Sequence, residues 1–181
     1  WITLEGCKLA LQSDVNYNNG DYISPPKKGL KAFSRNYTST LFDKEGYEEG
    51  LHLNLFDGFE DTESYLNYMD AFFGSIDAND LLGMLNTWQM GDIGKHQKFN
   101  NNTKEALANI NCPALVMPSS TDLSFPARNN IPEVSEMSDA ELVIINTKHG
   151  HLAGGMSTAL TSQEDVTFID KNIKEFLKKI T

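Results

Sequence analysis

The sequence has little of several features that mark large protein classes. Its 181 residues include only two cysteines, Cys7 and Cys112, too few for a disulfide framework or a cysteine-rich metal cluster. Lysine and arginine total 15 against 25 aspartate and glutamate residues, which gives a net charge of −10. A phosphate backbone requires a basic surface, so no nucleic-acid partner is expected. No apolar run approaches the ~18 residues that cross a membrane, so we expect no membrane partner and a cytoplasmic protein.

The rest of the composition is typical of a folded globular protein. Hydrophobic residues make up 40% of the chain, which has 13 glycines and 6 prolines. Such a chain can bury a core and is neither disordered nor collagen-like. Its length fits a single domain, since domains typically have ~150 residues. The first residue is Trp1 rather than Met, so a truncated domain that has lost a targeting signal stays open.

The first 110 residues carry helical patterns and turns but no strand pattern. Turn residues dominate residues 1–60, where we expect irregular structure and one helix over 30–42. A helix capped by Asp61 or Thr62 is predicted next because its apolar residues recur with a 3.6-residue period. Further helices are predicted after Asp77 or Asn79 and over 103–110. The apolar residues of the first periodic helix are Tyr65, Leu66, Met69, Phe72, Phe73 and Ile76.

After residue 110 the pattern changes to alternating strands and helices. Apolar runs at 113–117 and 141–146 predict two buried strands, and helices are predicted over 127–137 and after Ser162. This alternation is typical of a parallel sheet covered by helices, that is, of an α/β fold. Two strands are too few for a stable parallel sheet. We therefore expect an incomplete sheet and a chain that forms about half of a larger domain.

An acid and a histidine follow the two predicted strands. Asp122 comes after the first strand and His151 after the second, with room for one helix and one strand between them. Functional groups of α/β sheets lie beyond the carboxyl ends of strands, and acid before histidine is the order of the α/β-hydrolase triad. In that triad the acid orients the imidazole, which takes the proton of the nucleophile. Two alternatives stay open: Asp122 as a cap of the following helix, and a zinc site that includes His149 and His151.

The nucleophile of such a triad is missing from the sequence. No G-x-S-x-G segment occurs, and the nearest match, residues 155–159 around Ser157, follows His151 and so has the wrong order. Ser75 lies within a helical pattern, and neither cysteine has a strand-to-helix context. Without a nucleophile the covalent step has no attacking atom.

Several segments follow one another in a recognisable order. They are Asn19-Gly-Asp-Tyr22 with Pro26 and Gly29-Leu30, Glu63-Ser-Tyr-Leu-Asn-Tyr68, Ile76-Asp-Ala-Asn-Asp-Leu-Leu82 with Asp92, Ser120-Thr-Asp-Leu-Ser-Phe-Pro126, and Gly150-His-Leu-Ala-Gly-Gly155 with Asp165 and Phe168-Ile-Asp170. Together they resemble the homoserine O-acetyltransferase-like (MetX-like) family of α/β hydrolases over roughly residues 14–180. Each motif is modest, but their shared order is specific.

The resemblance implies a role for each part of the chain. Residues 1–110 would form a linker and helical lid, and residues 111–181 would form the C-terminal core segment with the acid and histidine loops. Asp122 would be the triad acid and His151 the base, and Arg35, Tyr37 and Asp92 would bind substrate. An acyl group would pass from acyl-CoA, through an acyl-serine, to a hydroxyl acceptor. No cofactor would stay bound, and the complete protein would form a homodimer through the lid.

The leading hypothesis is therefore the C-terminal portion of an acyltransferase whose serine lies outside this chain, which alone would be inactive. Homoserine enzymes of the family carry an Asp directly after the histidine, whereas this chain has Leu152. Hydrolysis of esters on the same fold is the second hypothesis, because water could replace the hydroxyl acceptor. A non-catalytic fragment, or one half of a complementing pair, is the third.

Overall fold

A computed structural model describes residues 1–155 and 162–180 and divides them into two compact units. Unit 1 consists of residues 1–40 and 59–91, and unit 2 of residues 41–58 and 92–181. This division differs from the one inferred from the sequence, because residues 41–58 and 92–110 group with the strand-bearing segment. The assignment of a lid over residues 1–110 stays a prediction. No helix of the described residues combines the length and apolar character needed to cross a membrane.

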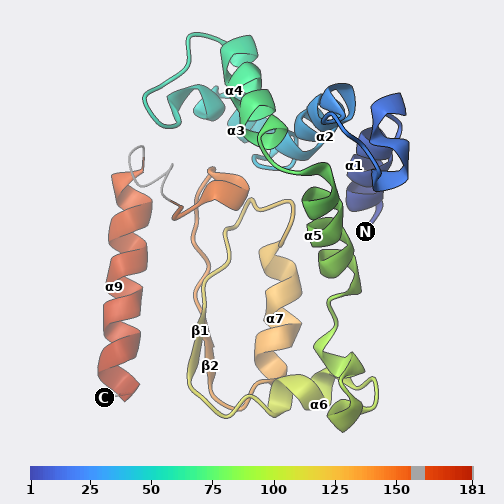
Figure 1. Cartoon of the computed structure of the whole chain (residues 1–181). Coiled ribbons are helices and arrows are strands. Elements are labelled where there is room, and N and C mark those ends of the chain that lie inside the picture. The colour runs from blue at the N-terminus through green and yellow to red at the C-terminus, as the bar shows by residue number, and fades with distance from the viewer. Residues whose placement is uncertain (156–161, 181) are drawn as a thin grey trace. The chain divides into compact units, whose positions relative to one another are not determined.

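Unit 1 is helical throughout its regular structure (Figure 1). Its elements are α1 (Ile2–Gln12), η1 (Val15–Gly20), α2 (Lys27–Thr38), α4 (Thr62–Gly74) and α5 (Ala78–Met90). Helix α2 packs against both α1 and α4. The side chains of Leu11, Leu30, Phe33 and Tyr65 are almost completely buried between these helices.

The helix starts in unit 1 follow from short polar side chains. Asp61 accepts the backbone N–H of Ser64, whose hydroxyl in turn accepts the N–H of Asp61, so α4 begins with a capping box. Asp77 accepts the backbone N–H of Asn79 and caps α5. Both helices are confirmed, although α4 ends at Gly74 and leaves Ile76 outside it.

The expectation of irregular structure in residues 1–60 is wrong for several segments. Residues 2–12 form α1, which buries Leu4, Cys7 and Leu11 on one face. The helix expected over 30–42 begins earlier and ends at Thr38, and a short helix, α3 (Lys44–Glu48), lies in unit 2. Among the turn residues of this segment, Asn18 and Asn19 both have positive φ.

Unit 2 contains two parallel strands, β1 (Ala114–Val116) and β2 (Ala140–Leu142), paired with Ala114 opposite Ala140. Helix α7 (Ala127–Glu136) packs on one side of this pair and α9 (Gln163–Ile180) lies on the other (Figure 1). Lys179 at the end of α9 bonds Glu141 of β2. The remaining elements are η2 (Leu51–Asn54), η3 (Ile93–Lys95), η4 (Gln97–Phe99), α6 (Thr103–Ala108) and η5 (Gly150–Leu152).

The parallel pairing and the expected helices after each strand are confirmed, but the strands are shorter than predicted. Beyond them the pairing continues as single contacts between two loops. Ile145 donates its N–H to the Pro118 carbonyl, and Ser120 donates to the Ile145 carbonyl. The loop after β1 and the loop after β2 therefore leave the sheet side by side.

Candidate active site

The two loops beyond the strands bring Asp122 and His151 together. Nδ1 of His151 lies 3.0 Å from Oδ2 of Asp122. An ionised carboxylate only accepts hydrogen bonds, so Nδ1 carries the hydrogen and Nε2 is the free nitrogen of the neutral ring. Among the described residues, none forms a hydrogen bond with Nε2. This arrangement is the one in which an acid orients an imidazole base.

The other carboxylate oxygen of Asp122 holds the acid loop itself. Oδ1 accepts the backbone N–H of Ser124 at 2.7 Å and that of Phe125 at 2.9 Å. Helix α7 begins later, at Ala127, with no side-chain cap. Asp122 therefore forms a local turn rather than capping α7, and its Oδ2 faces His151.

A glycine with left-handed backbone places His151. Gly150 has φ +56°, and a Cβ at this position would overlap the Leu41 carbonyl. The backbone N–H of His151 donates to that same carbonyl at 2.8 Å. The N–H of Gly150 donates to Oγ1 of Thr121 at 3.1 Å. The histidine turn is thus tied both to residues before α3 and to the acid loop.

The Asp122–His151 pair lines a cavity of about 320 Å³. Phe125 lies beside it, with its ring centroid 5.6 Å from that of His151. Two other polar atoms of the lining residues, Ser119 Oγ and Asn130 Oδ1, are buried and take no hydrogen bond from the described part of the chain.

His149 has different partners from His151. Its Nδ1 lies 3.2 Å from Oδ2 of Asp165 and 3.0 Å from Oγ1 of Thr147. The two histidines therefore lie beside separate carboxylates. Within residues 1–155 and 162–180 no group of three or more His, Cys, Asp or Glu side chains is placed to hold a metal ion.

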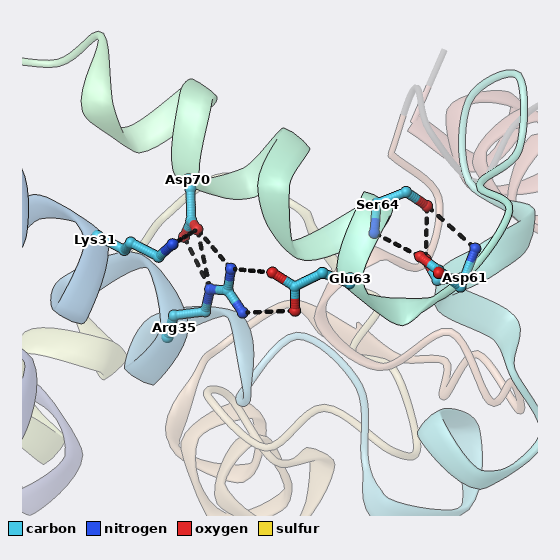
Figure 2. A network of polar contacts seen from close by, with 6 residues as sticks. All are labelled: Lys31, Arg35, Asp61, Glu63, Ser64 and Asp70. Carbon is cyan, nitrogen blue, oxygen red and sulfur yellow. Dashed lines mark hydrogen bonds and ion pairs between the residues drawn. The ribbon is translucent and has the colours of Figure 1, made fainter.

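The three residues expected to bind substrate each have partners within their own unit. In unit 1, Arg35 bonds both oxygens of Asp70 and both oxygens of Glu63 (Figure 2). These hydrogen bonds raise the pKa of Arg35 above its ordinary value. Burial alone would raise the pKa of Asp70, but the hydrogen bonds and positive charges around it, those of Arg35 foremost, together outweigh burial and hold that pKa below the usual range.

Tyr37 and Asp92 also have structural partners. Tyr37 stacks on Phe33 and lines an apolar cavity of about 600 Å³ within unit 1. Asp92, in unit 2, accepts hydrogen bonds from the backbone of Gly94 and the hydroxyl of Thr103. A role in substrate binding stays a prediction for all three residues, and Ser157 lies outside the described residues.

Comparison with known proteins places this geometry in context. No family model matches the chain. A probable esterase of Corynebacterium glutamicum is 31% identical over 171 residues, which cover 93% of this chain and 47% of that protein. The ethyl acetate hydrolase of Pseudomonas veronii is 28% identical over 79% of this chain and 41% of that protein. A homoserine O-succinyltransferase of Saccharophagus degradans is 27% identical over 81% of this chain and 43% of that protein.

Solved structures agree with the sequence relatives. An acetylester hydrolase from C. glutamicum superposes with a TM-score of 0.83 at 29% identity, over 98% of this chain and 49% of that one. The acetyl esterase MekB gives a TM-score of 0.85 at 25% identity, over 98% of this chain and 50% of that one. A homoserine O-acetyltransferase from Bacillus anthracis gives 0.68 at 23% identity, over 92% and 49%, which indicates a shared fold.

The chain is related to the homoserine O-acetyltransferase-like α/β hydrolases. The resemblance inferred from the motifs is thus confirmed, and this family contains both esterases and homoserine acyltransferases. The chain spans about half the length of the relatives that it matches.

Sequence reasoning missed several residues that build the site. Thr121 and Thr147 connect the two loops through their hydroxyl and carbonyl groups, and the Leu41 carbonyl holds the histidine turn. The run of hydroxyl residues before Asp122 and the Thr147 that precedes the two histidines were the available signal. A backbone carbonyl such as that of Leu41 leaves no signal in a sequence.

Proposed function

We propose that this chain supplies the acid and the base of an acyl-enzyme centre that hydrolyses small acyl esters. The observation that carries the proposal is the 3.0 Å contact between His151 Nδ1 and Asp122 Oδ2 at the ends of two adjacent parallel strands. In this proposal Asp122 is the triad acid and His151 is the base. The serine nucleophile is supplied by a segment outside residues 1–181.

The proposed roles follow from the protonation of the pair. With its Nδ1 hydrogen donated to Asp122, His151 presents Nε2 to accept the proton of a serine hydroxyl as that oxygen attacks the ester carbonyl. The imidazolium formed is stabilised by the Asp122 carboxylate. It then gives the proton to the departing alcohol, which leaves an acyl-serine. In the second half-reaction Nε2 takes a proton from a water whose oxygen attacks the acyl carbon. It then returns that proton to the serine oxygen as the acyl–serine bond breaks, and the carboxylic acid leaves.

Hydrolysis is favoured over acyl transfer by two features of the chain. The position after His151 is Leu152, so no carboxylate stands there to hold an ammonium group. Arg35 already forms ion pairs with two carboxylates within its own unit. Its positive charge is therefore compensated and does not favour binding of an acyl acceptor that carries a carboxylate. The esterase relatives, at 31% and 28% identity, support the same choice.

Acyl transfer from acyl-CoA to a hydroxyl acceptor such as homoserine is the second candidate. The homoserine O-succinyltransferase relative, at 27% identity, favours it. The two candidates share the same acyl-serine and differ only in the molecule that accepts the acyl group.

The test uses the complete gene product that contains residues 1–181. We expect it to hydrolyse 4-nitrophenyl acetate and to react with a fluorophosphonate serine probe. His151→Gln and Asp122→Asn should each lower kcat by roughly 10³-fold or more. His96→Gln is the matched control because His96 lies on an exposed turn, where it accepts from Lys98 N–H. Full activity in both site variants would contradict the proposal.

A second measurement separates hydrolysis from transfer. Release of acetate should proceed at the same rate with and without homoserine or simple alcohols. Consumption of acetyl-CoA only when homoserine is present would establish transfer in its place.

A further inference from the structure

A second polar cluster in unit 2 joins helix α9 to the loop that carries His151. Its members are Thr147, His149 and Asp165. Asp165 is 6% exposed and Thr147 is 9% exposed, so a buried carboxylate is held by a buried hydroxyl. A buried charge is costly unless it is paired and hydrogen-bonded. The cluster lies next to the proposed catalytic pair, yet none of its side chains takes part in the proposed reaction.

The hydrogens in this cluster can be assigned from its distances. The Thr147 hydroxyl donates to Oδ2 of Asp165 at 2.7 Å, because a carboxylate only accepts. Nδ1 of His149 faces the same Oδ2 at 3.2 Å and the Thr147 oxygen at 3.0 Å. Because the single hydroxyl hydrogen already points at Asp165, Nδ1 of His149 must carry its own hydrogen. Asp165 therefore accepts from the Thr147 hydroxyl, the oxygen of that hydroxyl accepts from Nδ1 of His149, and the same Nδ1 lies within ion-pair distance of the Asp165 carboxylate.

Asp165 is itself held by the start of α9. It lies in the first turn of that helix, and its backbone N–H donates to Oγ of Ser162 at 3.3 Å. A carboxylate near a helix N-terminus is favoured by the helix dipole. The Ser162 hydroxyl thus holds the backbone at the start of α9, while the Asp165 carboxylate is directed to Thr147.

Thr147 is also hydrogen-bonded to the acid loop. Its carbonyl accepts from the hydroxyls of Ser120 at 3.1 Å and Thr121 at 2.9 Å. Oγ1 of Thr121 also accepts the N–H of Gly150, the residue before His151. An unbroken set of hydrogen bonds thus runs from α9 through Thr147 to both loops, which end in Asp122 and His151.

We infer that Asp165 is a positioning residue that acts through Thr147 and His149 to hold the histidine turn in the geometry where His151 meets Asp122. The expected effect of Asp165 on kcat rests on the proposed function, whereas its expected effect on the position of His151 does not. Asp165 never touches the substrate. Its carboxylate holds Thr147 of the histidine loop, and Thr147 in turn accepts from the acid loop beyond the short strands. Small displacements of a base lower the rate of the chemical step far more than they weaken substrate binding.

The experiment compares Asp165→Asn with Asp170→Asn in the complete gene product. Asp170 lies on the same helix, where it is exposed and pairs only with Lys174 among the described residues. Asp165→Asn should lower kcat about tenfold or more and leave KM nearly unchanged. Asp170→Asn should change neither value.

A hydroxyl series tests the same connection without touching the charge. Thr147→Val removes the hydroxyl and keeps the shape, so it should lower kcat as Asp165→Asn does. Thr147→Ser keeps the hydroxyl and should restore kcat. This pair keeps the inference testable if Asp165→Asn fails to fold.

NMR of protein labelled with 15N in its histidine rings supplies a readout that does not depend on activity. The Nδ1 hydrogen of His151, bonded to Asp122, should give a downfield signal in the parent, in Asp170→Asn and in Thr147→Ser. That signal should be lost or broadened in Asp165→Asn and Thr147→Val. Folded variants that keep both the signal and the parental kcat would overturn the inference. Unchanged kcat in His151→Gln would instead overturn the proposed function, while the NMR comparison would still decide the positioning role.

Discussion

At the scale of single residues, Gly150 decides where His151 can lie. It has φ +56°, and a side chain at this position would overlap the backbone carbonyl of Leu41, which accepts the N–H of His151. Neither the backbone strain nor the overlap can be relieved by rotating a side chain. The residue before the histidine is therefore as constrained as the histidine itself.

We expect Gly150→Ala to lower the free energy of unfolding by more than about 2 kcal/mol, from the left-handed backbone and the overlap together. Urea denaturation followed by circular dichroism measures this change. Gly83→Ala is the control, since a Cβ at Gly83 meets no atom within 4 Å and the position is helical. That control should gain up to ~1 kcal/mol, because alanine is the better helix former. Equal stabilities for the two variants would contradict the argument.

The charge of Arg35 is paired with carboxylates inside unit 1. Its guanidinium bonds Asp70, whose side chain is 13% exposed, as well as Glu63 (Figure 2). Burial raises the pKa of Asp70, but the hydrogen bonds and positive charges of its neighbours, Arg35 foremost, together hold that pKa below its usual range. A lowered carboxyl pKa stabilises the fold above the ordinary value of about 3.9, and this stabilisation is lost as the pH falls through the lowered value.

Arg35→Met should therefore destabilise the chain by about 1–3 kcal/mol at pH 7, and by less as the solution is acidified below about pH 4. Lys31, 3.6 Å from Asp70, stays as a partner and limits the loss. Thermal unfolding across this pH range gives the comparison. The exposed pair of Lys44 and Glu48 supplies a control, since Lys44→Met should change stability by less than about 0.5 kcal/mol. A stability difference that grows on acidification would show that the sign is wrong.

At the scale of elements, the start of α4 depends on one reciprocal pair. Asp61 and Ser64 satisfy each other's backbone N–H groups (Figure 2). Asp61→Ala should cost about 1 kcal/mol of unfolding free energy, and Asp61→Asn should cost much less because it keeps an accepting oxygen. Chemical denaturation of the three proteins measures the difference. Equal losses in the two variants would indicate that the charge of Asp61, and not its cap, supports the helix.

The elements that could be predicted are those with a strong local signal. The α4 and α5 helices combine a 3.6-residue apolar period with an aspartate cap, and both were located. Helix α1 was missed although Leu4, Cys7 and Leu11 have helical spacing, because Ile2 and Leu9 lie exposed outside that buried face and blur the period, and turn residues follow the helix. Strand β2 was predicted too long because its apolar run continues into a loop that pairs with the first strand and the loop after it only through scattered backbone bonds, at Val143 and Ile145.

The sequence predicted the acid and the histidine of the candidate site but not the hydrogen bonds that hold them in place. Asp122 and His151 follow predicted strands, so their proximity follows from the parallel pairing. The link through Thr147 and Asp165 depends on where α9 packs, which local sequence does not determine. For the same reason the sequence could not show that Arg35 bonds Asp70 and Glu63, because these partners lie on a different helix.

At the scale of the whole molecule, unit 2 leaves apolar surface exposed. Leu123 and Phe125 in the acid loop are 54% and 49% exposed, and Ile173 and Ile180 on α9 are 42% and 46% exposed. Each strand of the pair has one edge that takes no strand partner among the described residues. Open strand edges and clustered apolar side chains both favour association between molecules. Residues 1–181 on their own should therefore self-associate as their concentration rises.

Sedimentation velocity over a range of concentrations measures this association. Ile173→Lys should shift the distribution toward monomer, because it places a charge within the exposed apolar surface of α9. Thr167→Lys makes the same change of charge at another exposed position on that helix and should leave association unchanged. Neither variant should lower the unfolding temperature much, since both side chains lie on the surface. A chain that stays monomeric at every concentration would show that this apolar surface and the open strand edges are tolerated in water, and that the two-stranded unit is complete enough to exist alone.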